Sequence, residues 1–248
     1  MVNITRGKRP SSLDTPEIRE YLDKVANYNE LSEEEKNHTK QPKTGNYRNW
    51  DVLEAFDNDF HKKCYLTEQK YANSWSMDVE HFKSKAFGQF PELRYEWTNL
   101  FPCSHIANIL KPKNEPNGGY LDPCNSADDV EEQIVYILEL DKSPRFEPKN
   151  NENIKAKNTA NLLEKIHNGI DSNSKQTTAE LRRIIRKQAV RLSSLVMDWL
   201  AAGKKGDKTE EVRTGRMIKD LLSRKSDFTM LLRSLAFVKA HIPPDFLD

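Results

Sequence analysis

The residues Asp78-Val79-Glu80-His81-Phe82 carry the strongest signal in this chain for its fold and its functional site. Asn99 follows eighteen positions after His81, and Asn108 follows nine positions after Asn99. A hard cation prefers oxygen ligands, which the Glu80 carboxylate and the Asn108 amide carbonyl can supply. Hydrolysis also needs a base that titrates near neutral pH, and histidine is the side chain that does so when unperturbed. The spacing therefore indicates a one-metal site that cuts phosphodiester bonds.

The segment 75–111 fits a strand, a long loop, a second strand and a helix. The loop is residues 87–96, which are rich in glycine, proline and aromatic residues. Pro102 suits the first turn of the helix that carries Asn108. We expect the surrounding aromatic residues to stiffen this unit as its apolar core. They are Trp50, Phe56, Phe60, Trp75, Phe87 and Trp97.

Two groups of motifs in the chain match patterns of known proteins. Glu80-His81-Phe82-x-Ser84-Lys85, Trp97-Thr98-Asn99-Leu100 and Cys103-x4-Asn108-x2-Lys111 resemble the HNH (ββα-metal) endonuclease motif. Ile4-x-Arg6-Gly7-x2-Pro10-x2-Leu13, Leu121-Asp122-Pro123-Cys124 and Asp128-Asp129-x-Glu131-Glu132 are similar to the PtuB family of HNH subunits. That family belongs to Septu-type anti-phage defence systems and also occurs as a retron-associated effector. The resemblance spans most of the chain and is firmest over residues 46–135.

The resemblance implies a role for each matching residue. His81 would be the general base, with Glu80 as one metal ligand and Asn108 as the second. Asn99 would brace the loop that aims the histidine. Lys111, one helical turn after Asn108, would face the same way and hold a phosphate oxygen.

The sequence departs from the family pattern at its cysteines. Many HNH proteins of this kind hold a structural zinc ion with two Cys-x-x-Cys pairs, whereas this chain has Cys64 and Cys103 without their second cysteines. We therefore expect no structural zinc, and Mg²⁺ or Mn²⁺ as the cofactor. His105, three residues before Asn108, is a further candidate metal ligand, since some HNH sites use a histidine there. The alternative for His105 is a partly buried, hydrogen-bonded side chain.

The implied function is a metal-dependent DNA endonuclease that acts as the effector of an anti-phage complex. Septu-type nucleases work with an ABC/SMC-like ATPase subunit of the PtuA type, and in retron versions with a reverse transcriptase and its RNA–DNA product. The chain has no Gly-x4-Gly-Lys-Ser/Thr phosphate loop, so any nucleotide dependence must come from another chain. Two alternatives stay open. One is a non-catalytic adaptor with a lapsed site that binds nucleic acid or protein, and the other is a nuclease that acts on RNA.

The composition sets the context for this function. A chain of 248 residues with 36% hydrophobic content is large enough for one substantial domain or two small ones. Three cysteines without regular spacing, and no charged-then-apolar leader, predict a reducing cytoplasm. No apolar run approaches the ~20 residues that cross a bilayer, so we expect no membrane role.

Positive charge gathers in residues 155–225, which hold 17 Lys and Arg against 8 Asp and Glu. Its densest part contains Arg182, Arg183, Arg186 and Lys187, which would share one face of a helix. Such a face can lie along a nucleic-acid backbone. A solvated helix face, or a contact with an acidic partner protein, explains the cluster equally well.

These signals predict a mainly helical α+β fold with a small ββα-metal core among helices. We expect an N-terminal arm, helix and linker over 1–45, the HNH core over 46–125, and a helical region over 126–248. Thr15 and Pro16 predict a helix start, and residues 27–46 a loop or a poorly packed linker. Residues 134–138 predict a strand that pairs with the chain around Phe146. Helices are expected from a capping box at Thr177-x-x-Glu180 to a stop at Gly203–Gly206, and over 208–224 and 227–240.

Overall fold

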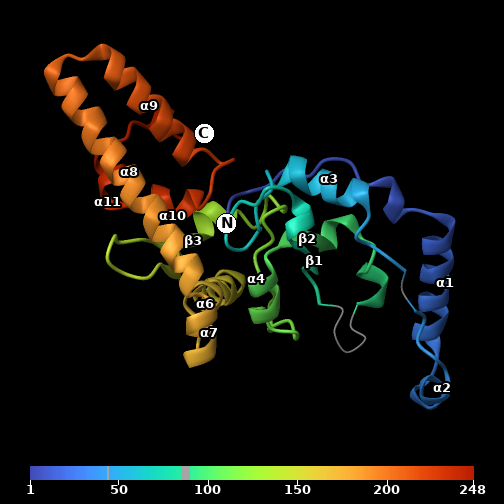
Figure 1. Cartoon of the computed structure of the whole chain (residues 1–248). Helices are drawn as coiled ribbons and strands as arrows, with labels where there is room; N and C mark the ends of the chain where they lie inside the picture. The colour runs from blue at the N-terminus through green and yellow to red at the C-terminus, as the bar shows by residue number, and fades with distance from the viewer. Residues whose placement is uncertain (44, 85–89) are drawn as a thin grey trace.

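The computed structural model describes residues 1–43, 45–84 and 90–248 (Figure 1). Helices dominate these residues, and the strands among them form two antiparallel sheets of two strands each. The predicted fold class, mainly helical α+β, is therefore confirmed. Among the same residues, no helix is both long and apolar enough to cross a membrane.

The chain begins with an extended arm, followed by η1 (Ser11–Leu13), α1 (Pro16–Glu30) and α2 (Glu33–His38). As predicted, the Thr15 hydroxyl caps α1 by accepting from the Ile18 amide, with Pro16 in the first turn. Residues 27–46, predicted as a loop or a poorly packed linker, contain the end of α1 and all of α2, so the loop alternative is wrong in part. A capping box between Ser32 and Glu35 starts α2, which buries no residue and so has no apolar stripe to reveal it.

The central part of the chain has the predicted order of strand, loop, strand and helix. After α3 (Trp50–Asp59) and η2 (Ser74–Ser76) come β1 (Asp78–His81), η4 (Pro91–Leu93), η5 (Trp97–Asn99), β2 (Leu100–Cys103) and α4 (His105–Leu110). β1 and β2 pair with Glu80 opposite Phe101. The prediction for Pro102 is wrong, since it lies in β2. The Ser104 hydroxyl caps α4 instead, because it can accept from the Ala107 amide.

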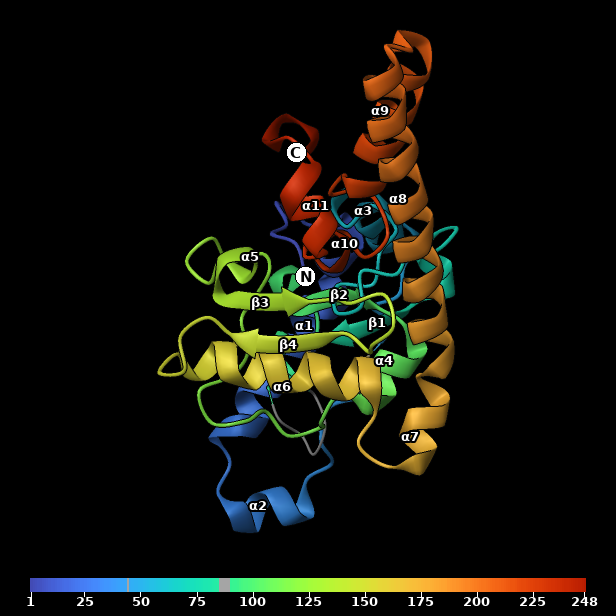
Figure 2. The same cartoon turned by 90° about the vertical axis from the view of Figure 1, so that its left-hand side faces the viewer.

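The rest of the chain is mostly helical. Its elements are α5 (Val130–Gln133), β3 (Ile134–Ile137), β4 (Arg145–Pro148), α6 (Ile154–Asn168), α7 (Ser172–Thr177), α8 (Ala179–Lys205), α9 (Lys208–Leu222), α10 (Thr229–Arg233), α11 (Ala236–His241) and η6 (Pro244–Phe246). As predicted, β3 pairs with the strand that carries Phe146, and α6 packs along this sheet (Figure 2). α8 and α9 form a long hairpin that projects from the body (Figure 1).

Three helix boundaries in this region were predicted from local sequence signals. Gly206 ends α8 with φ +72°, a left-handed conformation that glycine adopts without strain, as predicted. The predicted capping box at Thr177 is wrong, because Thr177 ends α7 and α8 has no side-chain cap. The helix predicted over 227–240 is divided into α10 and α11.

The N-terminal arm packs against the central unit. The Arg6 guanidinium lies 4.3 Å from the centre of the Phe101 ring and 4.7 Å from that of Trp97, and it donates to the Leu100 carbonyl at 2.9 Å. Buried side chains from all three predicted segments belong to one core cluster, which extends from the arm to α11. The β1–β2–α4 unit is thus held by contacts from the N-terminal arm and, through α4, from α6.

Candidate functional site

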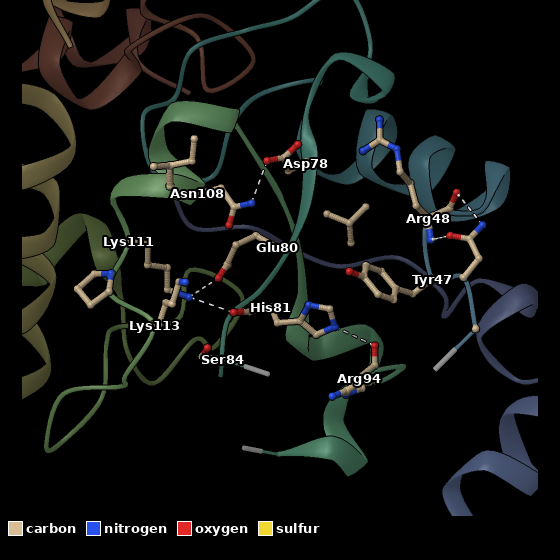
Figure 3. Close-up of a pocket in the computed structure, with 15 residues that line it drawn as sticks. Tyr47, Arg48, Asp78, Glu80, His81, Ser84, Arg94, Asn108, Lys111 and Lys113 are labelled. Atoms are coloured by element: carbon tan, nitrogen blue, oxygen red, sulfur yellow. Dashed lines mark hydrogen bonds and ion pairs between the residues drawn. The ribbon is translucent and has the colours of Figure 1, made fainter. Parts of the chain in front are cut away.

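A cavity of about 1030 Å³ lies where β1, its following loop and α4 meet (Figure 3). Glu80 and His81 reach it from β1, and Asn108 reaches it from α4. Residues 45–48 form another wall. The structure therefore brings together the acid, the imidazole and the carboxamide that sequence spacing placed in one site.

Glu80 is buried and paired inside the protein. Its Oε2 accepts from the Tyr65 hydroxyl at 2.9 Å, and its Oε1 accepts from the Lys111 ammonium. Burial raises the pKa of the Glu80 carboxyl above its ordinary value, although Lys111 and Tyr65 oppose that shift. Glu80 is thus a carboxylate whose charge is balanced locally, and one lone pair on each oxygen is already used.

Lys111, which was predicted to hold a phosphate oxygen, is paired within the protein. Besides Glu80, its ammonium donates to the backbone carbonyls of His81 at 3.0 Å and Phe82 at 2.7 Å. An ammonium has three hydrogens, so these three acceptors use all of them. Lys111 therefore joins α4 to the end of β1 and has no hydrogen left over for a phosphate oxygen in this arrangement.

The His81 ring is held by its backbone surroundings. Its Nε2 lies 3.1 Å from the Arg94 carbonyl oxygen, and its ring makes an edge contact with Tyr47 at 4.8 Å between centroids. A carbonyl only accepts hydrogen bonds, so in the neutral ring the hydrogen lies on Nε2 and the lone pair on Nδ1. The contact with Arg94 thus fixes which nitrogen can take up a proton.

Asn99 ties together the two described ends of the β1–β2 loop. Its Oδ1 accepts from the Lys83 amide at 2.7 Å, and its Nδ2 donates to the carbonyls of Lys83 and Leu93 at 3.3 and 3.1 Å. These are the contacts of a bracing residue. Lys85 of the quoted motif lies outside the described residues.

Asp78 is a site residue that the sequence reasoning missed. Its Oδ2 accepts from Asn108 Nδ2 at 2.9 Å and lies 3.0 Å from His105 Nδ1. Asp78 and Glu80 are two positions apart on β1, so both face α4. That alternation was the signal available in the sequence. His105, which was predicted as a metal ligand, is largely exposed and pairs with Asp78.

The oxygen donors of Asp78, Glu80 and Asn108 could hold a divalent cation. No group of three or more His, Cys, Asp or Glu side chains over residues 1–43, 45–84 and 90–248 is placed to bind a metal. The candidate set is instead two carboxylates and one amide carbonyl. Mg²⁺ is commonly held by one or two carboxylates together with water and substrate phosphate, so this donor set fits it and the similar Mn²⁺.

Cys64 and Cys103, which stand where many HNH proteins have zinc ligands, are buried next to each other. Burial alone would raise the pKa of the Cys64 thiol, but hydrogen bonds from Cys103, Thr67 and Ser104 lower it to about 6. The core beside them contains Phe56, Phe60 and Trp97, as predicted. Trp50 and Trp75 were predicted for the same core, which is wrong, since they are 65% and 50% exposed. Phe87 lies outside the described residues.

The predicted basic face on α8 is partly used within the protein. Arg182 donates to the carbonyls of His167 and Lys175 at 2.9 and 2.7 Å, and Arg183 pairs with Glu180. These contacts link α7 and α8 and lower the charge that the helix presents to solvent. Arg186 and Lys187 remain exposed on α8. None of the four residues lines the β1–α4 cavity.

Other cations surround that cavity. Arg48, Arg94 and Lys113 line it together with Lys111, against the two carboxylates of Asp78 and Glu80. Lys113 is exposed at the rim, two residues after the buried Lys111. The cavity therefore combines an acidic floor with a cationic surround, which attracts anions such as phosphate.

No protein-family model matches the chain, and comparisons with curated proteins and with solved structures found no match either.

Proposed function

We propose that this chain is a metal-dependent endonuclease of the HNH type that hydrolyses phosphodiester bonds in DNA. The observation that carries the proposal is the convergence of Glu80 and His81 from β1 with Asn108 from α4 on one cavity (Figure 3). The order of strand, loop, strand and helix around these residues is the order that the resemblance implies.

His81 is the general base in this proposal. Because the Arg94 carbonyl keeps the hydrogen on Nε2, Nδ1 takes the proton from the attacking water. Tyr47 and Asn99 are positioning residues, one against the ring and the other behind the loop. Fixing the ring in advance matters, since a base acts only within hydrogen-bond reach of the water.

In this proposal, other residues of the cavity bind the phosphate. A Mg²⁺ or Mn²⁺ ion held by Asp78, Glu80 and Asn108 would offset the negative charge that develops on the phosphate during hydrolysis. Lys113 takes the phosphate-holding role first expected of Lys111, because it is exposed at the cavity rim. Its charge draws the backbone of a nucleic acid toward the acidic floor.

The biological setting is proposed from the resemblance. In it, the nuclease is the effector of an anti-phage complex with a PtuA-like ATPase, and in retron systems also with a reverse transcriptase and its RNA–DNA product. The assignment of DNA as the substrate is also proposed from the resemblance, since a one-metal site contacts the phosphate and not the 2′ position of the sugar.

A plasmid-nicking assay tests the proposal. The chain, alone and co-purified with the ATPase with and without ATP, is incubated with supercoiled DNA and Mg²⁺ or Mn²⁺. His81→Ala should lower cleavage by at least ~100-fold, the usual contribution of a general base. His81→Gln should do the same while keeping a donor for the Arg94 carbonyl, so that the fold is preserved. His38→Ala, which removes an exposed histidine of α2, is the matched control.

Two results would count against the proposal. Nicking by His81→Gln at the wild-type rate would remove the base assignment. Inactivity of the wild-type chain in every preparation, together with nucleic-acid binding, would favour the non-catalytic adaptor.

A further inference from the structure

Two exposed tryptophans stand beside the candidate site. Trp50 begins α3 and is 65% exposed, and Trp75 lies in η2 and is 50% exposed. Their ring centroids are 6.0 Å apart, with the planes inclined by 42°. Each indole is in contact with the other, and much of each ring faces solvent. A pair of large aromatic rings left in water in this way is typical of a binding surface.

Arg48 connects this pair to the cavity. Its guanidinium donates to the Trp75 carbonyl at 2.5 Å and to the Met77 carbonyl, and it lies 5.9 Å from the centre of the Trp75 ring. Met77 directly precedes β1, and Arg48 itself lines the cavity with Glu80 and His81. The tryptophan pair is therefore fixed next to the place where a phosphate would bind.

The chemistry of the surface selects its ligand. A nucleotide offers a negative phosphate and a flat base at the two ends of one short unit. Arg48, Arg94 and Lys113 line the cavity, where their positive charges attract a phosphate, and the indoles offer π-faces to the base. A base can stack on an aromatic side chain only when it is not stacked inside a duplex.

We propose that Trp50 and Trp75 form a stacking platform for an unpaired nucleobase next to the bound phosphate. The preferred substrate is then a single-stranded or locally opened nucleic acid. The proposal rests on the proposed nuclease function for the identity of the phosphate site. It adds the substrate class and two residues that contact the substrate.

Binding measured without cleavage tests the platform separately from the nuclease. In EDTA, the full chain is titrated into a labelled thymidine oligonucleotide and into an abasic oligonucleotide of the same length, which has the same phosphates and no bases. Wild-type protein should bind the thymidine strand about 5- to 150-fold more tightly, which corresponds to ~1–3 kcal/mol for one stacked base. A uridine strand in a parallel arm separates DNA from RNA as the source of the base.

The variants decide the outcome. The double variant Trp50→Ala/Trp75→Ala should lose the preference for bases, and Trp50→Phe/Trp75→Phe should retain most of it. Met197→Ala, which removes an exposed apolar side chain on α8 outside the cavity, should behave as wild type. Equal binding of thymidine and abasic strands by the wild type, or wild-type preference in the double alanine variant, would overturn the platform. Absence of nicking alongside tryptophan-dependent binding would overturn the nuclease and leave the platform in place.

Discussion

Replacing Lys111 tests the arrangement at the floor of the cavity. Lys111 and Glu80 are 7% and 6% exposed, and their ion pair lies between α4 and β1. Removing one partner of a buried ion pair leaves the other charge without compensation, at a typical cost of about 3–5 kcal/mol. Lys111→Met keeps the length of the stem and removes the ammonium. We expect it to lower the free energy of unfolding by about that amount.

A second substitution distinguishes loss of the ion pair from loss of packing. Only loss of the ion pair predicts that the effect of Glu80→Gln on stability changes sign between the two backgrounds. In the wild type, Glu80→Gln should lower stability, because it leaves the Lys111 ammonium without its carboxylate. In the Lys111→Met background, the same change should raise stability, because it removes the uncompensated carboxylate. The glutamine side chain is neutral and can still accept from the Tyr65 hydroxyl.

Urea unfolding followed by circular dichroism at pH 7 measures all four proteins of this cycle. Lys113→Met is the matched control, since Lys113 is exposed two residues away and should change stability by no more than about 0.5 kcal/mol. If Lys111→Met costs less than about 1 kcal/mol and Glu80→Gln has the same effect in both backgrounds, the ion pair does not hold α4 to β1. Lys111 would then return as a phosphate ligand.

Two further predictions concern the scaffold. Burial lowers the pKa of His167 to about 4, whereas the unfolded chain has the ordinary 6.5. The unfolded state therefore binds the proton first, and stability should fall by ~2 kcal/mol between pH 7.5 and pH 5. Urea titrations at the two pH values should show this loss in the wild type and a correspondingly smaller one in His167→Gln; equal losses would contradict the assignment. Asn99→Ala should lower the unfolding free energy by about 1–3 kcal/mol, since it removes the hydrogen bonds that the buried Asn99 amide makes with the backbone of Lys83 and Leu93. An unchanged urea midpoint and slope would show that Asn99 does not brace the loop.

The sequence predicted the elements whose signals are local. Thr15 and Pro16 mark the start of α1 by their own chemistry, and Gly206 marks the end of α8 in the same way. The strand containing Ile134 and its pairing near Phe146 followed from a short apolar run and a turn. Spacing also placed Glu80, His81 and Asn108 in one cavity, because the motif fixes the order of strands and helix around them.

What the sequence did not predict depends on contacts between distant segments. The contacts of Lys111 are determined by the acceptors that β1 presents to the end of α4, and not by its position one turn after Asn108. Tryptophan is a residue type expected in a core, yet Trp50 and Trp75 are exposed. The interior position is taken by Trp97, which stacks on Phe56 with 5.2 Å between the ring centroids. Residue type alone does not distinguish a core tryptophan from one at a binding surface.

The charge balance at the cavity floor bears on how a metal ion would bind in the proposed nuclease. Asp78 and Glu80 carry two negative charges, and Lys111 neutralises one of them while holding β1 and α4 together. Contacts within the protein therefore fix the floor, as the proposed catalysis requires. In the proposed site, the remaining charge would attract a divalent ion only weakly, because the Lys111 ammonium repels it. A phosphate group that arrives at the cationic rim adds the missing negative charge. If the proposed function holds, the cation and the nucleic acid should therefore bind cooperatively, each raising the affinity for the other.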